Sequence, residues 1–321
     1  MDRFARPAAL VAVAVLAAGC GSSTTTHDHA RPAGGATASA TPSATATATP
    51  APVKLHVTGR GHMPAPVQLP AMTAAGRSAL AMGGLSSADT SLTDVVRIDG
   101  ASGHLVGHLP SPLHDAAAAT AGGRTLFIGG GQSEVGSAAI ERVTRGGAVS
   151  SAGRLPAGAS DVEAATVGGT AYVVGGYTGT APLTTIVAVR PGAAPRVAGH
   201  LPRPLRYAAV AAVGGRVLIA GGTSGVTARR EILAFDPATG SVSKLGALPS
   251  PTTHAAGAAL GGRFYVLGGR GALLTSQRRT ILAIDPASGR VARAGRLPVA
   301  ISDAGAASFA DHITVAGGRT A

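Results

Sequence analysis

The chain has 321 residues, of which 45% are hydrophobic and 3% aromatic, and its net charge is +12. It contains a single cysteine, so no disulfide forms within the chain. The charge comes mostly from arginine, and no basic segment carries interleaved aromatic residues, so nucleic-acid binding is not indicated. A basic protein favours anionic neighbours such as phospholipid headgroups or wall polymers, although GC-rich codon use explains the arginine content equally well.

The N-terminal residues predict export and attachment to a lipid. Residues 1–6 are basic, and residues 7–18 form a weakly apolar stretch that is too short to span a bilayer. The stretch ends in Ala-Gly-Cys, which resembles a bacterial lipobox with Cys20 as the acylated residue. We therefore expect residues 1–19 to be a lipoprotein signal peptide and the protein to be anchored at the extracytoplasmic face of a bacterial cell membrane. The alternative is an ordinary secretory signal with an incidental cysteine.

Residues 20–52 have the composition of a disordered linker that begins at the lipidated Cys20. They are mostly Ser, Thr, Ala, Pro and Gly, with almost nothing to bury. A flexible chain of this length holds the following domain about 30 Å from the membrane. His27, Asp28 and His29 are of metal-ligating type, but three residues in a mobile tail make a poor site, so we predict no metal. The composition also allows O-glycosylation, which the sequence leaves open.

From residue 53 onward the sequence repeats one unit six times. A Leu-Pro-like pair is followed, 19 residues after its proline, by a Gly-Gly pair, and both recur at steps of 46, 46, 46, 47 and 49 residues. The prolines are Pro64, Pro110, Pro156, Pro202, Pro249 and Pro298, and the glycine pairs begin at Gly83, Gly129, Gly175, Gly221, Gly268 and Gly317. A constant offset within a period in the forties is typical of propellers and repeat arrays.

The pattern predicts four short strands in each copy. In the fourth copy, the glycines at 214–215 separate two apolar runs, which indicates a tight hairpin. The first run (208–212) is almost all alanine, which favours an innermost strand crowded around an axis, and the second (217–219) is apolar throughout, as in a strand covered on both faces. A third run (231–235) ends in an Asp-Pro-x-Thr-Gly turn, and a short outer strand leads to the next Leu-Pro pair.

These features resemble the kelch repeat family, whose marks here are the period, the Gly-Gly pair after the second strand and the apolar or aromatic run before that pair. The resemblance covers residues 53–321 and implies an all-β fold, a six-bladed kelch-like β-propeller. The chain departs from the family pattern because it has no tryptophan. The Trp-like position is occupied by Leu105, Val149, Val197, Val242 and Val291. Family members include protein-binding modules, sugar-processing propellers and a copper oxidase, so the fold alone does not choose a function.

The two ends of the repeat region predict how the ring closes. The sixth copy stops just after its second strand, at residues 317–321. Residues 53–58 precede the first Leu-Pro-like pair at the spacing of an outer strand. We therefore expect this N-terminal strand to complete the last blade and cover its edge. Its place in that blade, third or fourth, is left open.

The residues just before each alanine-rich strand are the best candidates for a ligand site. In a propeller, ligands meet the loops at one end of the channel, and the fourth and fifth residues after each Leu-Pro proline are polar in five copies. These pairs are Gln68-Leu69, His114-Asp115, Ser160-Asp161, Arg206-Tyr207, Thr253-His254 and Ser302-Asp303. In the alternative interpretation, the Asp and Ser residues cap the turn into the strand. Glu163 is a second unusual residue, because it stands near the axis where other copies have alanine or glycine.

The loops after the Gly-Gly pairs are expected to point to the same end of the channel. They contribute Gln132, Tyr177, Thr223, Arg270 and Arg319. A rim of arginine and tyrosine around aspartate and histidine suits a carbohydrate or an acidic peptide, although a solvated loop side chain is the plainer interpretation of any single one. The predicted ligand-binding residues are His114, Asp115, Asp161, Arg206, Tyr207, His254, Asp303, Tyr177, Arg270 and Arg319.

The predicted function is binding, by a monomeric module that presents its loop face to a protein or glycan partner, without a cofactor. The sequence lacks the Gly-x-Ser-x-Gly, His-Glu-x-x-His and phosphate-loop motifs. Copper oxidase chemistry needs a cysteine beside the metal, whereas Cys20 is expected at the lipid. The alternative is a carbohydrate-acting enzyme, epimerase- or mutarotase-like, that uses Asp and His at the channel mouth, and a structural envelope component is a third. Carboxylates and a histidine that converge at the mouth would favour the enzyme, and a flat rim of Arg and Tyr would favour binding.

Overall fold

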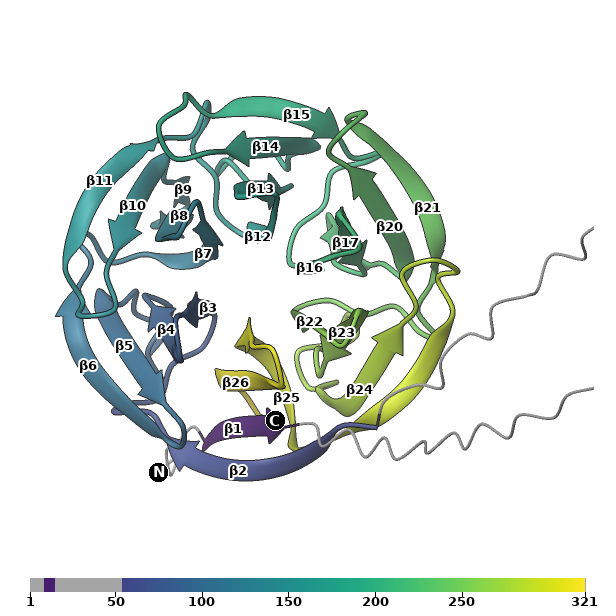
Figure 1. The fold of residues 1–321 in the computed structure, drawn as a ribbon, viewed down its shortest axis with the longest axis horizontal. Helices are drawn as coiled ribbons and strands as arrows, with labels where there is room; N and C mark the ends of the chain where they lie inside the picture. Colours follow the sequence, from purple (N-terminus) through teal and green to yellow (C-terminus); the bar gives the residue numbers. More distant parts are fainter. Residues whose placement is uncertain (1–8, 15–53, 321) are drawn as a thin grey trace, which may run out of the picture.

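The computed structural model describes residues 9–14 and 54–320, and all regular secondary structure in them is β-strand. The strands surround a single axis, and the first and last parts of the chain lie side by side in the ring (Figure 1). The expected all-β propeller is therefore confirmed. Cys20 and the linker at 20–52 lie outside the described residues. In the described part of the chain, no helix has the length and apolar character needed to cross a membrane.

Each of the first five sequence copies contributes an inner, a second, a third and an outer strand, in that order. The first copy forms β3 (Ala71–Ala75), β4 (Ser78–Met82), β5 (Asp94–Asp99) and β6 (Ser102–His108). The second forms β7 (His114–Ala121), β8 (Arg124–Gln132), β10 (Ala139–Val143) and β11 (Val149–Arg154), with β9 (Val135–Gly136) paired to β8. The third forms β12 (Glu163–Val167), β13 (Thr170–Val174), β14 (Thr185–Val189) and β15 (Arg196–His200).

The later copies follow the same order, with two additions. The fourth forms β16 (Ala209–Val213), β17 (Arg216–Ala220), β20 (Glu231–Asp236) and β21 (Ser241–Ala247), and its loop holds a hairpin of β18 (Thr223–Ser224) and β19 (Thr227–Ala228). The fifth forms β22 (Ala256–Leu260), β23 (Arg263–Leu267), β24 (Arg278–Ile284) and the first part of β25 (Val291–Ser308). The last group consists of the second part of β25, β26 (His312–Arg319), β1 (Ala9–Ala14) and β2 (His56–His62).

The described strands form five hydrogen-bonded sheets, so the expectation of six separate blades is wrong. One reason is β25, whose 18 residues run from the outer position of one group to the inner position of the next. Another is the parallel bridge between His62 and Ser102, which joins β2 to β6. Three strand groups therefore share one eleven-stranded sheet, the others form a five-stranded and two four-stranded sheets, and β18 and β19 form the fifth.

Inner strands from all six sequence copies surround the axis: β3, β7, β12, β16, β22 and the second half of β25 (Figure 1). Each contacts the next, and β25 contacts β3, which closes the ring. A Cβ atom on Gly257 would lie 2.4 Å from the backbone nitrogen of Val210, and one on Gly305 would lie 2.7 Å from Cβ of Met72. This close approach explains why the inner strands consist largely of alanine.

Each Gly-Gly pair attaches its repeat to the following one. Gly221 has a φ of +67°, and a Cβ atom there would lie 2.1 Å from the carbonyl oxygen of Thr252. The amide of Gly222 donates a hydrogen bond to the same oxygen at 2.8 Å. Across the ring closure, the amide of Gly318 donates to the carbonyl of Val67 at 2.8 Å. The pairs are therefore required by both their backbone conformation and their close approach.

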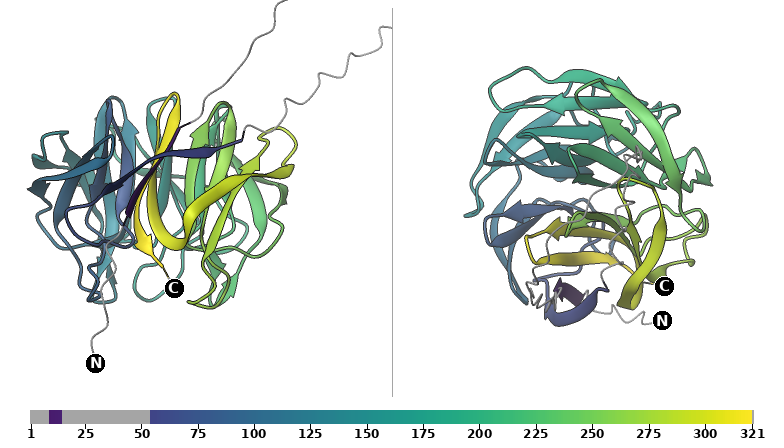
Figure 2. Two further views of the ribbon diagram at one scale, coloured as in Figure 1. Left: turned by 90° about the horizontal axis from the view of Figure 1, so that it is seen from below. Right: turned by 45° about the vertical axis from the view of Figure 1, so that its right-hand side comes forward.

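The N-terminal part of the chain closes the ring, as predicted. Strand β2 takes the outer, fourth place in the last group. The third place is taken by β1, which lies within the expected signal peptide and pairs with both β26 and β2. In the side view, the N-terminal strands lie against the yellow C-terminal strands (Figure 2).

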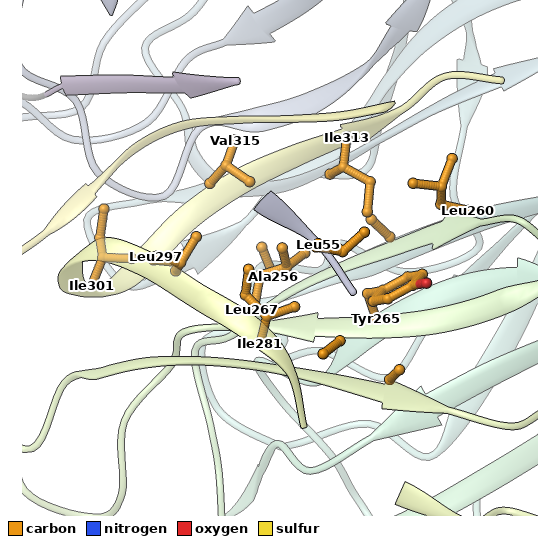
Figure 3. Close-up of a cluster of buried hydrophobic side chains, with 13 residues drawn as sticks. Leu55, Ala256, Leu260, Tyr265, Leu267, Ile281, Leu297, Ile301, Ile313 and Val315 are labelled. Atoms are coloured by element: carbon orange, nitrogen blue, oxygen red, sulfur yellow. The ribbon is translucent and has the colours of Figure 1, made fainter. Parts of the chain in front are cut away.

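Leu55, just before β2, anchors this closure in the core. Its side chain is buried in a cluster with Tyr265, Ile281 and Ile313, which come from the last two strand groups (Figure 3). Its amide donates a hydrogen bond to the carbonyl of Ala294 at 2.8 Å. Burial of a leucine side chain contributes about 2 kcal/mol, so β2 is held in place by packing as well as by hydrogen bonds.

Candidate functional site

The fifth residue after each Leu-Pro proline has the same unusual backbone conformation. All six have a positive φ, between 53° and 61°. They are Leu69, Asp115, Asp161, Tyr207, His254 and Asp303. Aspartate and histidine adopt this left-handed conformation more readily than other residues, whereas leucine and tyrosine are strained in it. A conformation that is kept even at Leu69 and Tyr207 indicates that the ring needs it in every repeat.

Backbone hydrogen bonds link these residues around the axis. The amide of Asp303 donates to the carbonyl of His254 (3.0 Å), and the amide of His254 donates to the carbonyl of Tyr207 (3.1 Å). The amide of Tyr207 donates to the backbone carbonyl of Asp161 (3.3 Å), and the amide of Leu69 donates to the backbone carbonyl of Asp303 across the ring closure (2.7 Å). The left-handed turn therefore directs each of these amides at the preceding repeat, and holds the side chains at one end of the channel.

The loops after the Gly-Gly pairs reach the same end. Isolated β-bridges pair Ser160 with Tyr177 and Thr253 with Arg270. Each bridge sets a loop residue beside the fourth residue after a Leu-Pro proline. The loops therefore form a rim around the ring of left-handed residues.

Arg206 lies between two tyrosine rings and a carboxylate. Its guanidinium carbon is 4.3 Å from the ring centroid of Tyr177 and 5.3 Å from that of Tyr207. Its Nε donates to Oδ2 of Asp161, a residue that is almost completely buried. Because a buried charge without its partner is strongly destabilising, Arg206 both orders the rim and compensates the charge of Asp161.

Tyr207 joins side chains from three repeats. Its ring stacks on the imidazole of His254, with 3.8 Å between centroids and 21° between planes. Its hydroxyl donates to Oδ2 of Asp115 at 3.2 Å. Burial raises the pKa of Tyr207, so the phenol remains a hydrogen-bond donor at physiological pH.

His254 is a neutral imidazole with a defined tautomer. Burial, together with the charges of Arg270 and Arg206, lowers the pKa of His254 to about 3. Nη2 of Arg270 lies 3.2 Å from Nε2, and because arginine only donates, Nε2 is the acceptor and the proton is on Nδ1. Nδ1 faces Oγ1 of Thr253 at 3.0 Å, and Oδ1 of Asp303 lies 3.8 Å from Nε2.

Asp115 and Asp161 lie in contrasting surroundings. Burial, and then the charge of Asp161, raise the pKa of Asp115 well above its usual range. Its Oδ1 is buried and makes no hydrogen bond of ordinary geometry within the described residues. Asp161 instead faces the guanidinium of Arg206. Burial also raises the pKa of Asp303, whose Oδ2 accepts a hydrogen bond from Ser302.

These side chains line a small cavity on the axis. Its walls include Leu69, Asp115, Asp161, Glu163, Tyr207, His254 and Asp303. Its volume is about 30 Å³, which is room for about two water molecules. A wider cavity of about 390 Å³, lined mainly by alanine and threonine of the inner strands, lies at the other end of these strands. The cavity among the polar groups is therefore much smaller than the one at the other end of the inner strands.

Glu163, at the start of β12, also lines the small cavity. Its side chain is exposed, but it faces the inside of the channel, where protein surrounds it. The resulting desolvation raises the pKa of Glu163 to about 8. Within residues 54–320, no three His, Cys, Asp or Glu side chains gather closely enough to hold a metal ion.

Comparison with known proteins agrees with this architecture. Residues 204–249, which span the fourth repeat, match the kelch motif family model. The chain is a β-propeller with a kelch motif in its fourth repeat. A solved structure titled "Structure of YjhT" is similar to this kelch propeller, with a TM-score of 0.66 and 15% sequence identity over 81% of this chain and 96% of that chain. At this identity the likeness shows the fold alone. No curated protein sequence matches the chain.

The kelch propeller brings together most of the residues that the sequence singled out. Five of them line the cavity: Asp115, Asp161, Tyr207, His254 and Asp303. Arg206 contacts Asp161 and Tyr207, and Tyr177 contacts Arg206. Arg270 contacts His254. Three of the predicted carboxyl groups and a histidine therefore line one cavity at the channel mouth, which is the arrangement expected of an enzyme. Arg206 and Tyr177 supply the rim expected of a binding module.

His114 and Arg319 lie further from the axis. Nδ1 of His114 is 2.9 Å from Oγ of Ser91, and its Nε2 is 3.6 Å from Oδ2 of Asp115, so it borders the site without lining the cavity. Arg319 faces Asp89 at 3.7 Å. Asp89 was not among the predicted site residues. The signal for it in the sequence was the polar residue Gln68, whose Nε2 donates a hydrogen bond to Oδ1 of Asp89 at 2.6 Å.

Proposed function

We propose that this kelch propeller binds the end of a glycan chain at the mouth of its axial channel. In this proposal the propeller is held at the outer face of a bacterial cell membrane by a lipid on Cys20. The observation that carries the proposal is Oδ1 of Asp115, which is buried, unpaired within the described residues and part of a cavity with room for about two water molecules. A single hydroxyl or amino group of a ligand fits that space and would satisfy this oxygen.

The surroundings of the cavity favour a sugar over a peptide. The floor combines donors and acceptors that are fixed in place: the carboxyl group of Asp115, the phenol of Tyr207 and the neutral imidazole of His254. Sites of this kind bind hydroxyl-bearing ligands through a few convergent polar groups. The rim supplies the aromatic ring of Tyr177, beside the guanidinium of Arg206, on which the body of a sugar ring can pack.

A glycan array tests this proposal, with the full chain carrying Cys20→Ser to prevent lipid attachment. We expect the chain to bind a defined set of glycans, and Arg206→Ala to weaken that binding at least tenfold. Arg293→Ala, on the outer strand β25, is the charge-matched control and should bind like the parent. Crosslinking on intact cells is done in parallel, and capture of a protein partner with no glycan retained on the array would contradict the proposal.

A second candidate function is acid–base catalysis on the bound sugar, because Asp115 and Asp161 are neighbours of opposite character. In such a step, Asp161 accepts the proton of the anomeric hydroxyl while the ring C1–O bond breaks. The electron pair of that bond goes to the ring oxygen, which takes the proton of Asp115. Reclosure after rotation gives the other anomer and returns both protons, so no co-reactant is consumed.

Exchange NMR on a reducing sugar identified by the array separates the two functions. Asp115→Asn should retain binding, because the amide still donates a hydrogen bond, and should lose exchange between anomers. If the exchange rate with the parent protein equals the rate in buffer alone, binding remains the function. Membrane attachment is tested separately: Cys20→Ser should move the protein from the membrane fraction to the soluble fraction of cells that export it.

A further inference from the structure

Strand β1 fills a slot between two strands that run parallel to each other. It is antiparallel to β26, with Val11 opposite Val315, and antiparallel to β2, with Val11 opposite Arg60. Adjacent strands lie about 4.8 Å apart, so β26 and β2 are separated by about 10 Å. Without a strand between them, each would present an unpaired row of backbone N–H and C=O groups.

The register of β1 is that of a third strand in the repeat. Leu10 stands opposite Gly61, three residues before a Leu-Pro-like proline. In the other copies the equivalent glycine stands opposite a large aliphatic residue of the third strand. These residues are Val95, Ile140, Ile186, Ile232 and Ile281, and each is at most 1% exposed. The slot is therefore shaped for a strand that carries a large aliphatic residue opposite Gly61.

The sequence directly before β2 does not provide such a residue. In the other copies the aliphatic residue lies 15 to 17 residues before the proline, as in Val95 and Pro110 or Ile232 and Pro249. At that spacing before Pro64 the chain has Thr, Ala and Thr at 47–49. Two prolines follow within three residues, and proline does not donate to a strand ladder.

Both walls of the slot are held by contacts that do not involve β1. On one side, the backbone amide of His62, at the end of β2, donates a hydrogen bond to the carbonyl of Ala101 at 3.2 Å. Leu55, just before β2, is fixed in the core. On the other side, Ile313 and Val315 of β26 are buried in the same core cluster as Leu55. Loss of β1 therefore leaves a slot with two fixed walls.

We propose that the space between β26 and β2 is a strand-binding slot that accepts an extended apolar segment of a partner polypeptide. The segment is about six residues long, consists of Ala, Val, Leu or Ile, and carries a large aliphatic residue opposite Gly61. Residues 9–14 occupy the slot in the full chain, with Leu10 opposite Gly61. The opening of the slot rests on the proposed removal of residues 1–19 before Cys20. Strand addition of this kind gains affinity from main-chain hydrogen bonds and specificity from alternate side chains.

The test uses the full chain with Cys20→Ser, a protease recognition sequence within residues 21–52, and the pair Ala12→Cys and Thr314→Cys. Positions 12 and 314 are opposite each other in the register, so oxidation should lock β1 in the slot. After cleavage in the linker, a fluorescent peptide with the sequence of residues 7–16 and solubilising lysines is added. The oxidised protein is the matched control, because its slot is blocked while the rest of the molecule is the same.

The expected result is that the reduced, cleaved protein binds the peptide and the oxidised protein does not. Bound peptide should also protect the amides of β26 and β2 from hydrogen exchange, and a peptide with Leu10→Asp should bind at least tenfold more weakly. The proposal is overturned if the pair does not crosslink, if both peptides bind equally, or if β26 and β2 stay equally protected after β1 has left. The intact mass of the exported chain reports removal of residues 1–19 on its own. If the exported chain retains residues 1–19, the slot does not open in cells. This outcome does not depend on the result of the glycan array.

Discussion

The hydroxyl of Tyr207 donates a hydrogen bond to Oδ2 of Asp115 at 3.2 Å, although the two residues are 92 positions apart in the sequence. The bond joins the second repeat to the fourth at the mouth of the channel. It exists because every repeat presents the same left-handed residue to the axis. The candidate site is thus a property of the closed ring, with no single repeat holding it.

The variant Tyr207→Phe should weaken glycan binding about tenfold while the protein stays folded. The change removes the donor to Asp115 but keeps the stacking on His254, so we expect a loss of about 1 kcal/mol in unfolding free energy. Calorimetric titration and urea unfolding measure the two effects. Unchanged affinity in a folded Tyr207→Phe protein would exclude this hydrogen bond from recognition.

Most of the fold could be predicted from the sequence, because the period, the Gly-Gly pairs and the alanine-rich runs each have a local physical cause. Gly221 is required by contact with Thr252, and the alanines by the crowded axis. The number of sheets could not be predicted, since it depends on the continuity of β25 and on one bridge between His62 and Ser102. The place of β1 was also missed, because the sequence assigned residues 1–19 to a signal peptide alone.

The site was predicted in part. Aspartate, tyrosine and histidine at one repeat position predicted a ring of polar side chains around the axis. In the structure, the residues at this position line one cavity. The sequence did not indicate which groups touch, since Tyr207 reaches Asp115 across the channel while Arg319 turns away to Asp89. Contacts of that kind depend on side-chain length and direction in the closed ring.

The variant Gly221→Ala should destabilise the protein far more than Gly214→Ala. Both glycines have a positive φ, +67° and +60°, so both substitutions strain the backbone by about 1 kcal/mol. Only at Gly221 does the new Cβ meet a carbonyl oxygen, at 2.1 Å, whereas nothing lies within 4 Å at Gly214. We expect a loss of about 3 kcal/mol or more at Gly221. Equal melting temperatures for the two variants would refute the role of the pair in joining repeats.

The variant Glu163→Gln should be more stable than the parent at high pH. The folded pKa of Glu163, about 8, lies above the unfolded value, so its contribution to stability is complete below about pH 4 and is lost as the pH rises to 8. Glutamine removes this dependence. The difference in melting temperature between the two proteins should therefore grow between pH 5 and pH 8 and then level off. A constant difference across this range would contradict the raised pKa.

The variant Tyr265→Phe should stabilise the protein slightly. Tyr265 is completely buried in the cluster of Figure 3, and its hydroxyl has no hydrogen-bond partner in the described part of the chain. Removal of an unpaired buried hydroxyl with retention of the ring gains about 1 kcal/mol. Denaturant unfolding measures this gain, and Phe264→Leu, which removes ring volume from the neighbouring buried position, should be destabilising in the same assay.

The most direct test of glycan recognition at the channel floor is calorimetric titration of the strongest glycan from the array into the Cys20→Ser chain and into its Asp161→Asn variant. Asparagine keeps the shape of Asp161 but removes the charge that fixes Arg206 and raises the pKa of Asp115. We predict that the variant binds at least tenfold more weakly while its melting curve remains cooperative. Equal affinity of the two proteins would contradict recognition at this floor and place the ligand elsewhere on the propeller.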